Sequence, residues 1–475
     1  MLINKKTKIV ATLGPATNTK EILTELASSG VNVFRINFSH ADYDDVKERV
    51  KQIREINEEN GYNVAILADL QGPKLRVGVM EEGVILEDGA EFVFTTEKCI
   101  GNSQKAFMTY QSFPRDVKPG EQILVDDGKL QFEVISTDKK LKVVTKVIVG
   151  GVLSSKKGVN LPNTNISLPA LTEKDKKDAI FALGLEVDWM ALSFVRTPED
   201  LRILRDLIAQ NSEYRVPVIA KIEKPEAVEN IDSLIPYCDG LMVARGDLGV
   251  EIPAHQVPLI QKQLVLKAKQ ARIPVIIATQ MMESMIDSLT PSRAEVNDVA
   301  NSVMDGADAV MLSGETSVGN YPVQVIQQMT QIIEAVEDSP LIQVPQNTPQ
   351  IKTNRFITKT ICQHAATMAN AIKAKAICTL TNSGYTAFQI SAWRPQADIL
   401  VFTSNKVILT QLNLIWGVKT FYYDKFVSTD DTIIDINKIA AEKGLVTTGD
   451  MLINLAAMPI ANKGMVNTLR ITEIE

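Results

Sequence analysis

The sequence predicts an α/β protein: a (β/α)8 TIM barrel with an inserted all-β lid domain and a C-terminal α/β domain. Eight short apolar segments typical of buried strands alternate with segments whose apolar residues recur at helical spacing, the pattern of such a barrel. After the third strand, a long interruption has the period-two alternation of half-buried strands. After the eighth unit, a stretch rich in Pro, Gln, Asn and Thr precedes a further set of alternating patterns.

The barrel strands are predicted from apolar runs that end in polar residues. They cover residues 8–12, 33–37, 64–69, 189–193, 218–223, 241–247, 275–279 and 309–313. Thr197 and Ser292 are typical helix starts. The predicted helices include residues 43–58, 198–210, 258–270 and 323–337. Because the active site of such a barrel lies at the carboxyl ends of its strands, the polar strand ends predict where the chemistry takes place.

The interruption predicts a lid above the barrel mouth. Residues 131–135 alternate apolar and polar side chains, and glycine-containing turn signals recur before and after them. A domain at this place can act as a lid that excludes water when substrate binds. The predicted boundaries are residues 1–72 and 169–340 for the barrel, 73–168 for the lid and 341–475 for the C-terminal domain, with a linker at 338–354.

Composition excludes several classes of protein. A length of 475 residues suggests about three domains. The net charge of −7 argues against a nucleic-acid-binding surface. The four cysteines are widely spaced, so neither a zinc site nor a disulfide framework is indicated. Neither a signal peptide nor an apolar run near the ~18 residues of a membrane span is present, so we expect a cytoplasmic protein without a membrane partner.

Charged residues end two of the predicted strands. Lys221 and Glu223 follow one apolar run, and Asp247 follows another. Buried charge needs a partner or a ligand, because unpaired charge is expensive to bury. With three histidines in the chain, two carboxylates favour a hard ion such as Mg²⁺ over zinc, and the lysine suits a transferring phosphoryl group. Structural salt bridges are the alternative for either stretch alone.

Further polar groups lie at other strand ends. Residues 245–249, with Thr279, form either an anion pocket of backbone N–H groups or a simple tight turn. Arg76, at the entrance to the lid, is either a phosphate contact or a solvated surface side chain. A cluster at the second strand, in which the arginine suits bidentate phosphate binding, consists of Arg35, Asn37, Ser39 and His40. No Walker A motif is present, so phosphate chemistry here belongs to the barrel.

Eight motifs together closely resemble those of the pyruvate kinase family. They run in the family's order along nearly the whole chain: KIVATLGP (8–15), FRINFSH (34–40), ADLQGP (68–73), KGVNLP (157–162), KIE (221–223), MVARGDLGVE (242–251), ATQM (278–281) and LSGET (312–316). The resemblance implies a glycolytic phosphotransferase that moves the phosphoryl group of phosphoenolpyruvate to ADP and yields pyruvate and ATP. The implied cofactor is Mg²⁺, with Mn²⁺ as a second suitable ion.

The resemblance also implies roles for individual residues. The metal ligands would be Glu223 and Asp247, and the phosphoryl contacts Lys221 and Arg35. The substrate carboxylate would meet the amides of Gly246 and Asp247 and the hydroxyl of Thr279. The relay that protonates the enolpyruvate intermediate would include Thr279, Ser313 and Glu315. The nucleotide side would comprise Asn37, His40, Arg76, Asp127 and Lys157.

The chain departs from many family members at the monovalent-cation region. That region corresponds to Asn37, Ser39, Asp69, Leu70 and Lys74. K⁺-dependent members typically have threonine, lysine and glutamate at the positions of Leu70, Gln71 and Lys74, so this chain resembles the K⁺-independent branch. We hypothesise that the Lys74 ammonium supplies the charge that K⁺ supplies elsewhere.

The C-terminal domain resembles the family's regulatory domain. Its segment Thr381, Asn382, Ser383, Gly384, Tyr385 and Thr386 is similar to the effector phosphate loop, where sugar phosphates or AMP act. On the residues alone, a helix cap is the better reading. Residues 459–464 lack the Trp and Arg of fructose-1,6-bisphosphate-regulated forms, which favours a monophosphate effector or none. The family also implies a homotetramer.

Two other functions compete with this one. A Mg²⁺-dependent lyase or aldolase acting on pyruvate enolate would share the metal carboxylates and an arginine, but it would not need the lid or Lys221. A non-catalytic metabolite sensor on the same fold would be signalled by loss of Lys221, Glu223 or Asp247, and all three are present.

Overall fold

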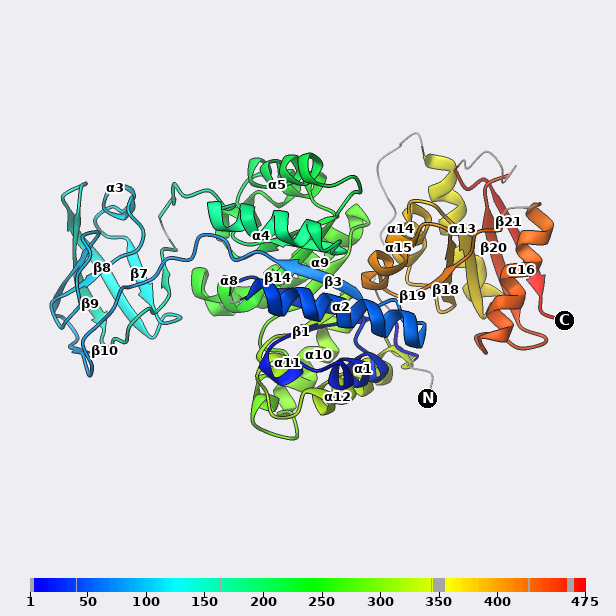
Figure 1. The fold of residues 1–475 in the computed structure, drawn as a ribbon, viewed down its shortest axis with the longest axis horizontal. Coiled ribbons are helices and arrows are strands. Elements are labelled where there is room, and N and C mark those ends of the chain that lie inside the picture. The colour runs from blue at the N-terminus through cyan, green and yellow to red at the C-terminus, as the bar shows by residue number, and fades with distance from the viewer. Residues whose placement is uncertain are drawn as a thin grey trace.

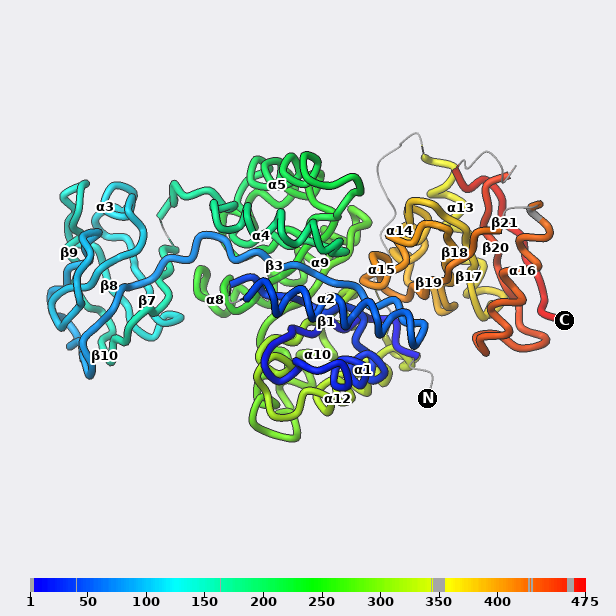
Figure 2. The backbone as a smooth tube through the Cα atoms, viewed as in Figure 1, coloured from blue at the N-terminus to red at the C-terminus, as the bar shows by residue number. Residues whose placement is uncertain are grey.

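The computed structural model describes residues 4–39, 41–162, 164–342, 344, 355–425, 428–458 and 465–475. Three parts lie in a row: a β-rich insertion, a central barrel and a C-terminal α/β part (Figure 1). The chain enters the insertion after β3 and returns to the barrel before α4, as the backbone trace in Figure 2 shows. His40 and the loop 459–464, both named in the sequence predictions, lie outside the described residues.

The central part is a closed barrel of parallel strands in the order β1-β16-β15-β14-β13-β12-β3-β2. The strands are β1 (Lys8–Thr12), β2 (Val33–Asn37), β3 (Ala65–Asp69), β12 (Trp189–Leu192), β13 (Val218–Ile222), β14 (Gly240–Ala244), β15 (Val275–Ala278) and β16 (Ala309–Leu312). The predicted fold class is therefore confirmed. The largest difference from the predicted strands is at β14: residues 245–247 do not continue this strand but begin helix α8 (Arg245–Glu251).

Helices surround the barrel, as Figure 1 shows. They are α1 (Lys20–Ser29), α2 (Tyr43–Asn60), α4 (Glu173–Gly184), α5 (Pro198–Asn211), α6 (Pro225–Glu229), α7 (Ile231–Leu234), α9 (Val257–Ala271), α10 (Arg293–Asp305), α11 (Gly314–Ser317) and α12 (Pro322–Glu337). Local capping explains several starts: Thr197 and Ser292, predicted as helix starts, form capping boxes with Asp200 and Glu295.

The strands alternate between two cores. Successive residues of a strand point to opposite sides: Ile9 and Ala11 of β1 face the helices, whereas Val10 faces the barrel interior. Val33 of β2 faces the interior as well. At the carboxyl ends the inward positions change from apolar to charged: Arg35 follows Val33 by two residues, and Lys221 follows Ile219 in the same way. The period of two thus aims charged side chains into the barrel mouth.

The insertion has its own apolar core, formed around phenylalanines such as Phe92, Phe94 and Phe132, whose rings meet edge to face or tilted. A six-stranded sheet has the order β11-β7-β8-β9-β5-β6, and β4 pairs with β10. The elements are β4 (Ile85–Leu86), β5 (Glu91–Thr95), β6 (Lys105–Phe107), α3 (Phe113–Asp116), β7 (Gln122–Val125), β8 (Leu130–Thr137), β9 (Lys142–Val149), β10 (Gly151–Val152) and β11 (Val159–Asn160).

The C-terminal part packs on the end of the barrel opposite the insertion (Figure 1). Its sheet has the order β19-β18-β17-β20-β21. Contacts to the barrel include Trp189 Nε1 donating to Gln411 O at 3.0 Å and Lys8 Nζ donating to Val418 O at 2.7 Å. The elements are α13 (Phe356–Ala371), β17 (Ala376–Leu380), α14 (Tyr385–Ser391), β18 (Asp398–Thr403), α15 (Lys406–Gln411), β19 (Val418–Tyr422), α16 (Thr429–Glu442), β20 (Met451–Ala456) and β21 (Thr468–Glu473). Among the described helices, none has the length and hydropathy that a bilayer crossing requires.

Candidate active site

A buried network of four charged side chains fills the carboxyl end of the barrel. Asp69 Oδ2 accepts from Arg35 Nε at 2.6 Å, and Lys221 Nζ lies 3.2 Å from Asp69 Oδ1. The same ammonium lies 2.9 Å from Glu223 Oε1. Asp69 and Glu223 are each 1 % exposed, and Arg35 and Lys221 are each 9 % exposed. Ions taken out of water cost several kcal/mol each before pairing, which makes such a cluster a candidate functional site.

The charged groups in this network shift one another's pKa values. Burial opposes ionisation of Asp69, but Lys221 and Arg35 outweigh burial and lower the pKa of Asp69. Burial likewise opposes the charge on Lys221, yet Asp69 and Glu223 outweigh it and raise the pKa of the ammonium. Lys221 therefore stays positive throughout the physiological pH range.

Ser193 connects the network to the start of the insertion. Lys221 Nζ donates to Ser193 Oγ at 2.7 Å, and that hydroxyl donates to the Leu70 carbonyl at 2.7 Å. The next residue, Phe194, has a φ of +55° and donates its amide to Glu223 Oε2 at 2.8 Å. Ser193 was absent from the predicted site, although its position at the polar end of a predicted strand was a usable signal.

Helix α8 starts beside a strained residue. Thr279 has a φ of +71°, an outlier for a β-branched residue, and its Oγ1 accepts the Gly246 amide at 2.7 Å. Backbone strain of this kind collects at functional sites. Arg245 packs across the same junction, where it donates to Thr279 O and Asp298 Oδ1, both at 2.7 Å. The Gly246 amide and the Thr279 hydroxyl, both predicted to meet substrate, are thus neighbours.

The predicted relay residues follow two neighbouring barrel strands, Thr279 after β15 and Ser313 and Glu315 after β16, and they are held differently. Glu315 accepts from the amide of Ser313 at 2.7 Å and from the amide of Met282 at 3.1 Å. Burial raises the pKa of this carboxyl. Within the described ranges, no hydrogen bond joins Thr279 to Ser313 or Glu315. The Glu315 carboxylate therefore holds the backbone at two places around the site.

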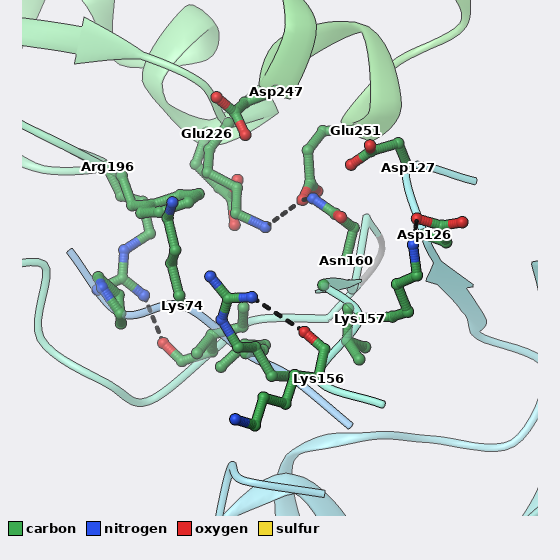
Figure 3. Close-up of a pocket in the computed structure, with 18 residues that line it drawn as sticks. Lys74, Asp126, Asp127, Lys156, Lys157, Asn160, Arg196, Glu226, Asp247 and Glu251 are labelled. Atoms are coloured by element: carbon green, nitrogen blue, oxygen red, sulfur yellow. Dashed lines mark hydrogen bonds and ion pairs between the residues drawn. The ribbon is translucent and has the colours of Figure 1, made fainter. Parts of the chain in front are cut away.

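A cavity of about 320 Å³ separates the insertion from the barrel mouth (Figure 3). Three of the predicted nucleotide-side residues line it: Arg76, Asp127 and Lys157. Arg76 Nη1 donates to Lys156 O at 2.9 Å, and Lys157 Nζ lies 2.9 Å from Asp126 Oδ1. Lining residues that the sequence reading did not predict include Asn160, Arg196, Lys224, Glu226 and Glu251. They come from the insertion, the connection between β12 and α5, the start of α6 and the end of α8, which only the fold brings together.

Three residues of the predicted monovalent-cation region accept hydrogen bonds within the protein. Asn37 Oδ1 accepts the Ser39 amide at 3.1 Å. Asp69 is held by Arg35, and the Leu70 carbonyl accepts the Ser193 hydroxyl. Lys74 lines the cavity together with Asp247 (Figure 3). Partial burial lowers the pKa of Lys74, and the Asp247 charge opposes this effect.

The donor set fits a hard divalent ion that is shared with substrate. Asp247 is exposed, and its charge adds to burial in raising the pKa of Glu223. A cation near both carboxylates relieves that repulsion. The described ranges hold no group of three or more His, Cys, Asp and Glu side chains suited to a metal. Mg²⁺ needs no such cage, because one or two carboxylates with water and substrate oxygens suffice.

The predicted effector segment follows β17 and runs into the first residues of α14 in the C-terminal part. The Thr381 hydroxyl accepts the Gly384 amide at 3.0 Å, and Gly384 has a φ of +76°. Gly384 is the N-cap residue of α14 and has no side-chain cap, so the Thr381 hydroxyl shapes the turn that precedes the helix.

Comparison with known proteins gives one consistent result. Residues 4–326 match the family model described as the pyruvate kinase barrel domain, and residues 359–472 match the pyruvate kinase alpha/beta domain. Pyruvate kinases from Geobacillus stearothermophilus and Mycobacterium intracellulare are 42% and 41% identical, over 99% of this chain and 80% and 99% of their own lengths. A crystal structure of a pyruvate kinase from Cryptosporidium parvum, 34% identical, superposes with a TM-score of 0.91 over 99% of this chain and 97% of that one.

Proposed function

The chain belongs to the pyruvate kinase family, and from that premise we propose how its residues carry the phosphoryl group from phosphoenolpyruvate to ADP. The enzyme is a pyruvate kinase, and it makes pyruvate and ATP. The observation that supports our assignment is the buried network of Arg35, Asp69, Lys221 and Glu223 at the carboxyl ends of the barrel strands.

Lys221 and Arg35 act on the transferring phosphoryl group. Phosphoryl transfer needs positioning and charge stabilisation more than covalent chemistry from the protein. Asp69 contacts both cations at 2.6 and 3.2 Å, so it fixes their positions before substrate arrives. Cations that are already in place cost no reorganisation during the reaction, and their effect is larger in a site that excludes water.

Glu223 and Asp247 hold the divalent cation that pyruvate kinases typically use, with Mg²⁺ preferred and Mn²⁺ accepted. When bound, the ion supplies positive charge to the phosphate and carboxylate oxygens of substrate. Glu223 is fixed for this role by Lys221 and by the Phe194 amide at 2.8 Å. Asp247 stands in the first turn of α8, at the edge of the cavity.

The remaining site residues bind the substrate carboxylate and ADP, and they protonate the enolate. The substrate carboxylate lies against the start of α8, where the Gly246 amide and the Thr279 hydroxyl already meet at 2.7 Å. The enolate that forms on loss of the phosphoryl group takes a proton on the side of Thr279 and Ser313, with Glu315 positioning the Ser313 backbone. ADP enters from the cavity side, against Arg76, Asp127 and Lys157.

Pyruvate formation is expected to require phosphoenolpyruvate, ADP and a divalent ion together. A lactate dehydrogenase-coupled assay measures it. EDTA should abolish the rate, and added Mg²⁺ should restore it, because two carboxylates alone leave the substrate charges unbalanced. Pyruvate formed without ADP would point to the lyase or aldolase alternative, and no pyruvate at all would refute the assignment.

We also propose that the enzyme does not require K⁺, because the Lys74 ammonium takes the place of that ion. The proposal is supported by the position of Lys74 beside Asp247 in the cavity and by the protein donors that engage Asn37, Asp69 and Leu70. A fixed ammonium and a bound monovalent ion carry the same charge.

The K⁺ proposal predicts a switch of dependence on one substitution. At saturating Mg²⁺, the wild-type rate should differ by less than about twofold between Na⁺ and K⁺ buffers, because Lys74 already supplies the charge. Lys74→Glu should be slow in Na⁺ and regain activity in K⁺. Lys156→Glu, a change of the same size on an exposed lysine of the same cavity, is the control and should not create a K⁺ response. Several-fold activation of the wild type by K⁺ would refute the idea.

Regulation and assembly are proposed from the family alone. We propose a homotetramer, and a phosphate-bearing effector such as a sugar phosphate or AMP at residues 381–386. Substrate-saturation curves with and without each effector test the second point.

A further inference from the structure

One hydrogen-bonded group joins the insertion to the barrel mouth. Asn160 Nδ2 donates to Glu251 Oε1 at 2.8 Å, and Lys224 Nζ lies 2.6 Å from the same oxygen. Glu251 is 5 % exposed and Lys224 is 6 % exposed. We refer to these three side chains as the lid bridge. Figure 3 shows Asn160 reaching Glu251 from the other side of the cavity.

On the barrel side, the lid bridge is anchored next to both candidate metal ligands. Lys224 directly follows Glu223, and Glu251 lies one helical turn after Asp247 on α8. The lid bridge is therefore attached to the ends of two separate strands, β13 and β14.

On the lid side, Asn160 is rigidly connected to the predicted nucleotide contacts. Its strand β11 pairs with β7, and the Asp126 amide donates to Gly158 O at 3.1 Å. Lys157, three residues before Asn160, binds Asp126, and both Asp126 and Asp127 hold positive φ angles of 53° and 57°. A constrained backbone of this kind transmits the position of Asn160 to Lys157 and Asp127.

The lid bridge buries charge at a cost in free energy that a purely structural contact does not require. Glu251 Oε2 is buried and has no hydrogen-bond partner among the described residues. A buried carboxylate with one unsatisfied oxygen loses free energy relative to an apolar pair of similar shape. Because Oε1 serves both Lys224 and Asn160, the carboxylate is used to hold a lid residue and a barrel residue at one point.

We propose that the lid bridge is a positioning device that sets the distance between Lys157 and Asp127 of the lid and the strand ends of the barrel, and thereby the affinity for the nucleotide. The inference rests on the proposed placement of ADP in this cavity. Asn160, Glu251 and Lys224 are positioning residues here, and none of them needs to touch the transferring group.

An amide–carboxylate swap tests the bridge. Asn160→Asp opposes two carboxylates, and Glu251→Gln leaves the Lys224 ammonium against a neutral amide. Each is expected to raise KM for ADP about tenfold while kcat changes by less than about threefold, because the lost bond is one to a charged group. The double variant again has one carboxylate and one amide, so it should return KM for ADP to within about threefold of the wild type.

The distance between the lid and the barrel can be measured without turnover. Spin labels at Glu82→Cys on the insertion and Glu199→Cys on α5, in a Cys99→Ser background, report the lid-to-barrel distance distribution by pulsed EPR. The single bridge variants should shift or broaden it, and the double variant should restore it. Gln104→Glu, an exposed amide-to-acid change elsewhere on the insertion, is the matched control and should have no effect.

The outcomes separate the two ideas. Unchanged distances in both single variants, or no recovery in the double variant, overturn the lid bridge. A shifted distance with an unchanged KM for ADP refutes the placement of the nucleotide and with it the proposed role. Should Glu251→Gln fold poorly, Asn160→Ala, which leaves the Lys224–Glu251 pair intact, must still raise KM for ADP and shift the distance.

Discussion

Lys221→Met is expected to lower kcat by about 10³-fold, because it removes a preorganised cation from a site that excludes water. The side chain keeps its length, so the change isolates the charge. The substitution also leaves Asp69 and Glu223 with less compensation, and breaking a buried ion pair costs about 3–5 kcal/mol. Coupled-assay kinetics give the catalytic effect, and thermal unfolding gives the loss of stability.

A buried lysine at the opposite end of the barrel provides a control that separates the loss of stability from the loss of kcat. Lys8, 4 % exposed on β1, donates to Val418 O at 2.7 Å. Lys8→Met should lower stability but leave kcat within about threefold of the wild type, because it lies far from the strand ends that carry the chemistry. Lys221→Arg keeps the charge and should retain more stability than activity, since a guanidinium does not match the ammonium geometry. A kcat within tenfold of wild type for Lys221→Met would contradict its assigned role.

Glu223→Gln and Asp247→Asn are expected to raise the Mg²⁺ concentration for half-maximal activity by about 10²-fold or more, since even groups that only orient metal ligands change affinity 10–100-fold. Glu223 should have the larger effect on stability, because it is 1 % exposed whereas Asp247 is exposed. Activity against Mg²⁺ concentration checks the shift, and Mn²⁺ binding followed by EPR checks it without turnover.

Asp188→Asn provides the control for losing a buried carboxylate. Asp188 directly precedes β12 and pairs with Arg54 at 3.1 Å. Its loss should reduce stability and leave the Mg²⁺ dependence unchanged. Wild-type Mn²⁺ affinity in both ligand variants would show that the ion is held elsewhere.

Local sequence pattern predicted much of the barrel. Runs such as 8–12 and 33–37 coincide with β1 and β2 because a buried parallel strand must be apolar and short, and its polar end is visible in the sequence. The error at residues 241–247 has a local reason as well. Asp247 belongs to the first turn of α8, where glycines at 246 and 249 weaken the helical pattern and favour a turn.

The lid bridge and the Asp69 contacts could not be predicted from spacing. Arg35 and Asp69 are 34 residues apart, and Asn160 and Glu251 are 91 apart. The sequence places Asp69 in the monovalent-cation region, and the structure adds its contacts to Arg35 and Lys221. Such pairings depend on strand order and on the path of the insertion, neither of which leaves a periodic trace.

By itself, the sequence determined the barrel, the family and the charged strand ends, because the apolar runs, their polar ends and the eight motifs are all local features of the chain. The tertiary structure alone decided which charges meet. Closure of the barrel places β2, β3, β12 and β13 side by side, and this brings Arg35, Asp69, Ser193 and Lys221 within hydrogen-bond distance. The return of the insertion over the mouth then adds Asn160 to Glu251, since the contact forms only when distant segments fold together.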